Sequence, residues 1–500
     1  MMTKRTSIQP KIQFCTIEDL MPNEHFLRDV ESAIDFNFIY DRVEHLYSAV
    51  GRPSIDPVIV VKMLLIGYLY DIFSERRLMS EIQVNIAYRW FLGIDLDEAV
   101  PDHSTLSQLR RRKFSNSRLF EDIFDEIVRK CIEIGLVTGE TLVNDSTHIR
   151  ANAANDKREI VKVKVEPSAY MKKLDEAALA DGLIKEVGKT SALAKEKTTE
   201  QTKSVTDPEC GLLNRPGKPT GFHYLNHQTI DASSGIITDV FVTAGNVNDT
   251  IPHAERIKYQ VEKFGFKTKE IGADAGFDSP EIHAEMLELD VKTYITERNI
   301  KNQFTGQTYS VNDFIYDSKN DEYICPNNCL LTFRTFKKGE GQKIYRSKHQ
   351  DCKNCPLREN CISEKAKIKE VSRPYHKTEY EAQIQNNAST RYGTIQRLRK
   401  IWCEGTFAHQ KARHGLSRAK MRGIAKTTEQ CLLSACAVNL KRMIKWKVSK
   451  SPNIHYLTDS VLLAHLWVFF YAFCQQLRNV TPLTKRYIWA VSCKINCPKK

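Results

Sequence analysis

Two aspartates in this chain directly follow strand-like runs and precede small or hydroxylated residues. Asp145 comes after the apolar pair at 142–143 and before Ser-Thr, and Asp274 ends the run 269–274 and precedes Ala-Gly. A carboxylate at a strand end is open to solvent and yet fixed by a rigid sheet, which is what a Mg²⁺ ligand requires. The alternative for each is an aspartate that caps a turn between a strand and a helix, and for either residue alone this capping role is favoured.

A third acid, Glu404, lies in a segment that is otherwise cationic. Residues 391–423 contain nine Lys or Arg and one acidic residue, Glu404 itself. Apolar residues spaced by three and four predict a helix with a stripe that faces the core: Ile395, Leu398 and Trp402. At 100° per residue, four side chains fall within about 60° of one another on a different face: Arg397, Lys400, Glu404 and Lys411. A lone carboxylate in such a strip indicates a functional residue more than a solvated salt-bridge surface.

Three converging carboxylates would provide hard oxygen ligands for two Mg²⁺ ions. Two ions about 4 Å apart stabilise both the attacking and the leaving oxygen when a phosphodiester bond is cleaved or exchanged. The cations around Glu404 would hold a nucleic-acid strand by its phosphates, which positions the strand without reading its sequence. The residues expected to contact DNA are Arg397, Lys400, Lys411, Arg413, Arg418, Lys420 and Arg422.

A cluster of cysteines lies between the second and the third acid. Cys352 and Cys355 form a C-x₂-C pair, whose spacing lets two thiolates bind one tetrahedral ion. Cys325 and Cys361 are the expected other ligands of a structural Zn²⁺ site, with Cys329 as a competitor for Cys325. Bound zinc would supply folding energy to a small, loop-rich module. The alternative is a set of reduced thiols without metal.

The elements that must position these residues begin with a helical stretch. Residues 1–138 are predicted to be helical, with an apolar helix at 57–70 and a helix after Pro101 that ends in the basic run 110–113. This module is either a helix-turn-helix-like DNA-binding domain or an ordinary helical packing domain.

Strand-like patterns start near residue 139 and predict a mixed α/β core. Its strands are expected at 140–149, 222–230, 236–243, 268–273 and 291–296, with a helix at 280–289. The core therefore occupies 139–300, interrupted at 157–205 by a stretch rich in Lys, Glu and Ala that predicts a solvated helical insertion. The cysteine-rich inserted module covers 301–390, core helices with the third acid cover 391–445, and the tail 446–500 has no assigned role.

The composition is that of a soluble globular protein. The chain has 500 residues, 41% hydrophobic and 27% charged, which argues against wholesale disorder. A net charge of +13 favours a polyanionic partner, nucleic acid before a membrane surface. The N-terminus has no apolar run, so we expect a cytoplasmic protein whose cysteines are thiols or metal ligands. The apolar stretch 461–474 is shorter than the ~20 residues of a spanning helix, and a buried or interfacial helix is predicted there.

The sequence around the three acids resembles one known family. The three segments are NDSTHIRANA around Asp145, ADAGFDS around Asp274, and the run from Glu404 to Gly423, EGTFAHQKARHGLSRAKMRG. In this order, with about 130 residues between successive acids, they resemble bacterial insertion-sequence transposases of the DDE class over roughly residues 15–445. The cysteine spacing resembles the insertion found in one subgroup of these enzymes.

This resemblance implies a fold, a reaction and a set of partners. It implies an RNase H-like mixed-sheet core with an N-terminal helical domain, and a metal-binding triad made of Asp145, Asp274 and Glu404. The implied reaction is Mg²⁺-dependent cleavage at the terminal inverted repeats of the protein's own element, followed by attack of the freed 3′-hydroxyl on target DNA. Pairing two element ends implies at least a homodimer on DNA.

The chain departs from its relatives at two positions before the third acid. Related enzymes often carry Tyr and Arg seven and four residues before the catalytic Glu, where this chain has Arg397 and Lys400, whereas Lys411 matches. Lysine lacks the bidentate fork of arginine, so the handling of the strand end is expected to differ. Two alternatives stay open: an RNase H-like nuclease that cuts without joining, and a non-catalytic DNA-binding protein derived from a transposase. A third alternative is a membrane-associated protein that uses 461–474.

Overall fold

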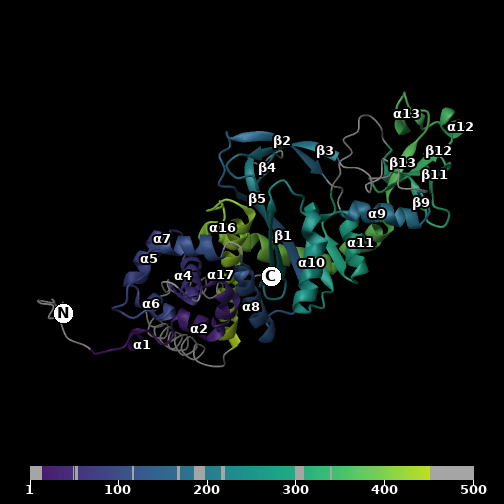
Figure 1. Ribbon diagram of the computed structural model, residues 1–500. Coiled ribbons are helices and arrows are strands. Elements are labelled where there is room, and N and C mark those ends of the chain that lie inside the picture. The colour runs from purple at the N-terminus through teal and green to yellow at the C-terminus, as the bar shows by residue number, and fades with distance from the viewer. Residues whose placement is uncertain are drawn as a thin grey trace, which may run out of the picture. The chain divides into compact units, whose positions relative to one another are not determined.

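A computed structural model describes most of the chain (Figure 1). The described residues are 14–48, 50, 54–114, 117–165, 169–184, 197–214, 220–298, 309–337 and 340–450. Residues up to 444 belong to one compact unit, and residues from 445 onward to a second. The predicted helix at 461–474 lies outside the described residues. Among the helices that are described, none is long and apolar enough to cross a membrane.

The N-terminal segment is helical, as its apolar periodicity predicts. Helix α4, Pro57–Leu69, is buried along nearly its whole length, since it is apolar on all its faces. Helix α7, His103–Leu109, begins where the Asp102 side chain accepts a hydrogen bond from the Ser104 backbone N–H, and a π-helical turn, η2 (Arg110–Phe114), follows it. The remaining helices are α1 Ile17–Leu20, α2 Phe26–Ala33, α3 Phe38–Val43, α5 Glu75–Val84, α6 Ile86–Leu92 and α8 Leu119–Glu133.

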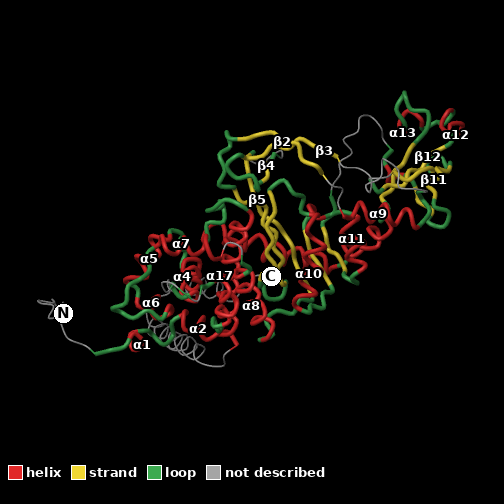
Figure 2. The backbone as a smooth tube through the Cα atoms, in the orientation of Figure 1, coloured by secondary structure: helices red, strands yellow, loops and turns green. Residues whose placement is uncertain are grey.

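The following segment forms a mixed sheet, and the expected hairpin and later strands are present. Strand β1 (Thr141–Arg150) pairs antiparallel with β5 (Gly221–Asp231) and parallel with β7 (Glu270–Ala273). Strand β6 (Ile237–Ala244) extends the antiparallel side, and β8 (Lys292–Ile295) pairs parallel with β7. The short strand β4 (Gly211–Leu213) also pairs with β5, which makes the sheet six-stranded. Figure 2 shows these strands in yellow.

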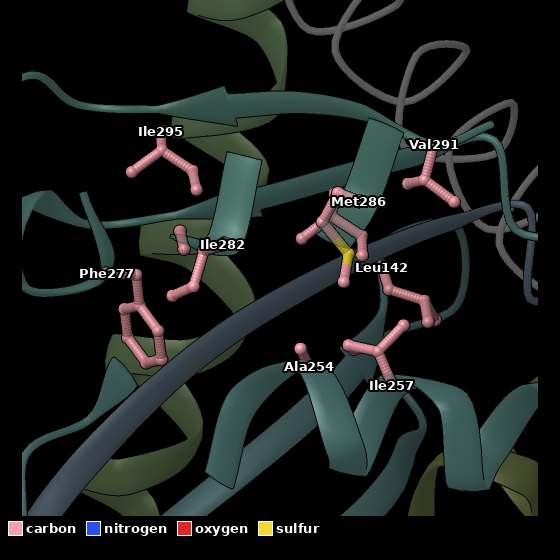
Figure 3. Packing of buried hydrophobic residues seen from close by; sticks show 10 residues of the cluster. Leu142, Ala254, Ile257, Phe277, Ile282, Met286, Val291 and Ile295 are labelled. Atoms are coloured by element: carbon pink, nitrogen blue, oxygen red, sulfur yellow. The ribbon is translucent and has the colours of Figure 1, made fainter. Parts of the chain in front are cut away.

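Helices cover the two faces of this sheet because its strands bury alternate residues on each side. On one face, Leu142 of β1 and Ile271 of β7 pack against α10 (Thr250–Phe264) and α11 (Pro280–Glu288), as Figure 3 shows for the residues it labels. On the other face, Gly272 has no side chain, and Ile395 of α15 (Thr390–Arg399) takes the place that a Cβ would occupy. Helix α15 therefore lies directly on the strand that leads to Asp274.

The prediction of a charged helical insertion at 157–205 is wrong in part. Strands β2 (Arg158–Val165) and β3 (Lys197–Ser204) pair antiparallel, and among the described residues of this segment only α9 (Ala169–Ala180) is helical. Ladder hydrogen bonds use the backbone, so a two-stranded ribbon with exposed charged side chains needs no apolar face. The alternation of Val and Lys at 161–165 is the strand signal that the overall composition obscured.

The cysteine-rich segment contains a second sheet, antiparallel and five-stranded. Its order is β13-β12-β11-β10-β9, and its buried core includes Tyr323, Leu331 and Tyr345. The strands are β9 Ile315–Asp317, β10 Glu322–Ile324, β11 Leu330–Lys337, β12 Gln342–Ser347 and β13 Glu370–Pro374. The helices are α12 His349–Lys353, α13 Arg358–Cys361 and α14 Lys377–Ile384. Helices α16 (Gly405–Arg413) and α17 (Ile424–Lys450) complete the described chain.

Candidate active site

Strand register brings the two aspartates together. Val143 of β1 lies beside Gly272 of β7 in the parallel pairing. Asp145 comes two residues later within β1, and Asp274 comes two residues later, directly after β7 ends, so they follow paired positions on strands about 4.8 Å apart. Because side chains alternate between the faces of a strand, both acids point to the face that α15 covers. The Asp274 carboxylate also accepts a hydrogen bond of 2.8 Å from the Gly276 backbone N–H, so it caps the turn as well.

The third acid reaches the same face through a π-helical turn. The turn η6, Lys400–Glu404, separates α15 from α16. A π turn places residues i and i+5 together, and Arg399 and Glu404 are joined in this way, with 3.1 Å between Nη2 and Oε1. The other guanidinium nitrogen of Arg399 donates to Asp145 Oδ2 at 2.8 Å. One buried arginine therefore connects two of the three predicted acids.

The same turn corrects the predicted helical face. Counting 100° per residue through an uninterrupted α-helix set Arg397 and Lys400 beside Glu404, but the extra residue in the π turn changes the register. Arg397 and Lys400 are exposed, and the cation that contacts Glu404 is Arg399. The turn also leaves Ile401 exposed while Cys403 is fully buried.

The electrostatics of Asp145 show that all three acids are near one another. Burial raises the pKa of Asp145 to about 6, Arg399 opposes this rise, and the negative charges of Asp274 and Glu404 reinforce it. A group of carboxylates around one mostly buried aspartate is suited chemically to a divalent cation. As the described side chains stand, no three His, Cys, Asp or Glu residues are close enough to hold an ion. Arg399 lies between Asp145 and Glu404 in this arrangement.

Two residues of the site were missed by the sequence reasoning, Arg399 and Asp249. Asp249 precedes α10 and accepts a hydrogen bond of 2.5 Å from Ser146, the residue after Asp145. Its other carboxylate oxygen lies beside Gly276, which binds Asp274. Asp249 therefore contacts the residue after Asp145 and lies next to the turn that follows Asp274. The signal that could have found it was the turn Gly-Asn-Val-Asn-Asp before an amphipathic helix.

The remaining cations of the strip are spread over helices and a loop. Arg397, Lys400, Arg413, Arg418, Lys420 and Arg422 are exposed, and Lys411 is half-buried. Arg418 and Arg422 hydrogen-bond Asn152, just beyond the end of β1, and Arg413 pairs with Asp71. The cations from 418 to 422 are thus held beside the strand that carries Asp145.

The predicted zinc ligands also gather in space. Cys325, Cys352 and Cys355 all lie near enough to Cys361 to contribute, after burial, to the raised pKa of its thiol. The Cys329 backbone N–H donates to the Cys325 sulfur at 3.3 Å, and this type of contact stabilises a thiolate. The thiols converge, although among the described residues they do not form a site that could hold an ion as they stand.

The raised pKa of Asp145 predicts a pH dependence of stability. The carboxyl group titrates near 3.8 when unfolded and at about 6 when folded. Between these values the folded protein binds more protons, so its free energy of unfolding falls as the pH rises from about 4 to 6 and then levels off. A rise of the pKa from 3.8 to about 6 changes the free energy of unfolding by at most about 3 kcal/mol.

Urea unfolding in EDTA at pH 4.5 and pH 7 measures this dependence. Several buried histidines, among them His253 and His414, have lowered pKa values and contribute in the opposite direction. The quantity to compare is therefore the difference between the wild type and Asp145→Asn, which removes the titrating group. A difference that does not change with pH would contradict the prediction.

The mixed sheet and the helix on its face bring three acidic residues together, and a separate sheet carries the cysteines. Comparisons with known proteins then give the family. A family described as "Transposase domain (DUF772)" matches residues 15–112, and one described as "Transposase DDE domain" matches residues 324–444. The chain is a DNA transposase of the DDE class, of the insertion-sequence type. Glu404 lies within the second matched segment, while Asp145 and Asp274 lie outside both.

No curated protein matches the chain. Among solved structures, a piggyBac transposase synaptic complex with hairpin DNA matches at 11% identity, over 89% of this chain and 84% of that chain. Its TM-score of 0.24 is too low to support any argument.

Proposed function

We propose that this transposase cleaves DNA strands at the ends of its own insertion sequence and joins them to target DNA, in a reaction that depends on divalent metal ions. Asp145, Asp274 and Glu404 are the proposed ligands of two Mg²⁺ ions. The observation that carries the proposal is the bridge that Arg399 makes between Asp145 and Glu404, with Asp274 two residues beyond the last β1–β7 pair and near enough to raise the pKa of Asp145. Acids more than 250 residues apart in sequence thereby meet at one place.

The sheet supports an RNase H-like core. Its order is β6-β5-β1-β7-β8, with the first three strands antiparallel and the last two parallel to β1. On this strand order we propose that the core is RNase H-like, with the first acid on the central strand of its sheet. The helix that carries the third acid covers one face.

Bound divalent ions would neutralise phosphate charge and lower the pKa of an attacking water molecule. The chain itself supplies rigid positions for the reacting groups. Strand β1 holds Asp145, the end of β7 holds Asp274, and Asp249 binds the Ser146 hydroxyl next to Asp145. Arg399 stabilises the acids while no metal ion is bound. When ions replace it there, its guanidinium can bind a phosphate oxygen, because a guanidinium pairs well with both carboxylates and phosphates.

The proposed partners are the terminal inverted repeats and target DNA. The exposed cations from 397 to 422 supply phosphate contacts, and their affinity for DNA should fall with salt. Two element ends are cut and joined together, so we propose a homodimer in the synaptic complex. We propose a cytoplasmic location, on the nucleoid when DNA is bound.

The test is an assay with labelled element ends, a target plasmid and Mg²⁺, with EDTA as the control. Cleaved and joined products are expected. Cleavage without joining would identify the RNase H-like nuclease, and DNA binding without cleavage would identify the non-catalytic alternative.

We also propose a structural Zn²⁺ site made by Cys325, Cys352, Cys355 and Cys361. Their convergence around Cys361 supports it. Purified protein should contain close to one zinc per chain, and Cys352→Ser should remove most of it and destabilise the module, because metal binding supplies folding energy. Elemental analysis measures the zinc, and Cys431→Ser on α17, a buried cysteine outside the module, is the control. Zinc-free wild-type protein would contradict the proposal.

A further inference from the structure

A cavity of about 600 Å³ lies between the two segments matched by the transposase families. One wall comes from the start of α5 and from the α7–η2 helix, and the other from the loop after α16 and the start of α17. Its volume is in the range of pockets that hold small organic ligands. None of the three acids lines it.

A buried ion-pair network holds the two walls together. Arg110 of η2 pairs with Glu75 of α5 and, at 2.5 Å, with Glu429 of α17. The Lys420 ammonium group crosses the cavity to donate to the Phe73 carbonyl at 3.4 Å. These contacts join the N-terminal helices to the part of the chain that carries the three acids. The walls of the cavity are therefore fixed relative to each other within one compact unit.

The chemistry of the lining suits a nucleotide. Five cations, Arg76, Arg110, Arg111, Lys420 and Lys426, face two acids, and both acids pair with Arg110. Phe73 is 44% exposed and lines this cavity, with the Lys420 ammonium 5.6 Å from the centre of its ring. Cations for phosphate next to an open aromatic ring for a base are the means by which proteins hold unpaired nucleotides.

The cavity is connected to the active site through the backbone. The Arg150 N–H donates to the Ser417 carbonyl at 3.1 Å, and the Ala419 N–H donates to the Arg150 carbonyl at 2.8 Å. Arg150 ends β1 five residues beyond Asp145, a distance of about 17 Å along an extended strand. A DNA strand that passes from Asp145 to the cavity side of Arg150 would cover this distance with a few nucleotides.

We propose that this cavity binds an unpaired nucleotide of the DNA strand being processed, with the base against Phe73 and the phosphates on Arg76, Lys420 and Lys426. The inference rests on the proposed DNA substrate and deepens it. A regular duplex would present only its backbone to the surface and could not place a base on the ring. The volume and the aromatic wall favour an unpaired nucleotide.

The test uses full-length protein in EDTA and a single-stranded hexadeoxynucleotide of thymidines with one 2-aminopurine, whose fluorescence changes on stacking. Phe73→Ala should weaken binding about tenfold and remove the fluorescence change, and Phe73→Trp should retain both. Arg76→Ala should weaken binding about fivefold, because it removes a phosphate contact. Arg77→Ala is the matched control, since Arg77 is the next residue on α5, does not line the cavity and pairs with Glu81.

Equal effects of Arg76→Ala and Arg77→Ala, or unchanged binding by Phe73→Ala, would overturn the proposal. Equally strong binding of a blunt duplex would show a backbone contact in place of a nucleotide pocket. Tight binding of free 2-aminopurine nucleoside monophosphate alone would identify a free nucleotide as the ligand and overturn the assignment to DNA. The binding measurement contains no metal, so it is independent of cleavage. If the Phe73 and Arg76 variants bind more weakly than the Arg77 control but the protein does not cleave DNA, only the catalytic proposal is rejected.

Discussion

Asp145→Asn, Asp274→Asn and Glu404→Gln should each lower the rate of DNA strand cleavage by at least about 10³-fold while leaving DNA binding intact. Each change removes one negative charge and keeps the shape of the side chain. Metal-ion catalysis is worth several kcal/mol of transition-state stabilisation, and each 1.4 kcal/mol changes the rate tenfold. The measurement is single-turnover cleavage of labelled element ends in Mg²⁺, next to a binding assay in EDTA.

A matched control separates loss of the site from loss of any acid. Glu288→Gln changes an exposed carboxylate near the end of α11 and should retain full cleavage. The three acids act as one centre, so a double variant should be little worse than a single one. Full cleavage by any one of the three variants would remove that residue from the active site.

Arg399→Ala should destabilise the metal-free protein by about 2–4 kcal/mol, because it leaves buried Asp145 without its cation. The side chain of Arg399 is only 9% exposed and that of Asp145 14%, whereas Glu404 is 55% exposed and contributes less. Mg²⁺ or Mn²⁺ should restore more stability to this variant than to the wild type, since a divalent ion replaces the missing charge. Urea unfolding with and without metal measures both effects.

The control for this prediction is Arg397→Ala, two residues earlier on α15 and exposed. It removes the same charge from the strip without touching Asp145. Arg399→Lys should retain part of the stability, because one ammonium group can pair with one acid but cannot bridge two. Equal stability of the Arg399 and Arg397 variants would contradict the assigned role of Arg399.

The sequence was informative where local pattern decides the structure. The strands that carry or precede the two aspartates were predictable from β-branched runs and glycine turns. Asp274 follows its strand as predicted, but the placement of Asp145 at a strand end is wrong, because β1 continues to Arg150 and Asp145 lies in its middle. Helix α4 was predictable from its length and apolarity. The sequence was less informative where paired strands are distant in the chain. Strands β2 and β3 are separated by 31 residues and pair through backbone hydrogen bonds, so the charged composition wrongly indicated a helix.

The three acids of the site were predicted from the sequence, but the residues that contact them were not. Glu404 was identified from its isolation among cations, but its neighbour was taken to be Lys400 because nothing in the local sequence marks a π turn. Asp249 was missed because its role depends on Ser146, which is 103 residues earlier in the chain. Contacts of this kind are set by tertiary packing, which periodicity does not report.

The π turn at 400–404 means that the aim of the third acid depends on a single surplus residue. In an uninterrupted α-helix, two residues five apart in sequence lie about 140° apart around the axis, so Arg399 and Glu404 would point to different faces. The surplus residue lets both side chains reach the same place, while Gly272 lets α15 lie directly on β7. One inserted residue can therefore set the direction of this acid without any change to the sheet.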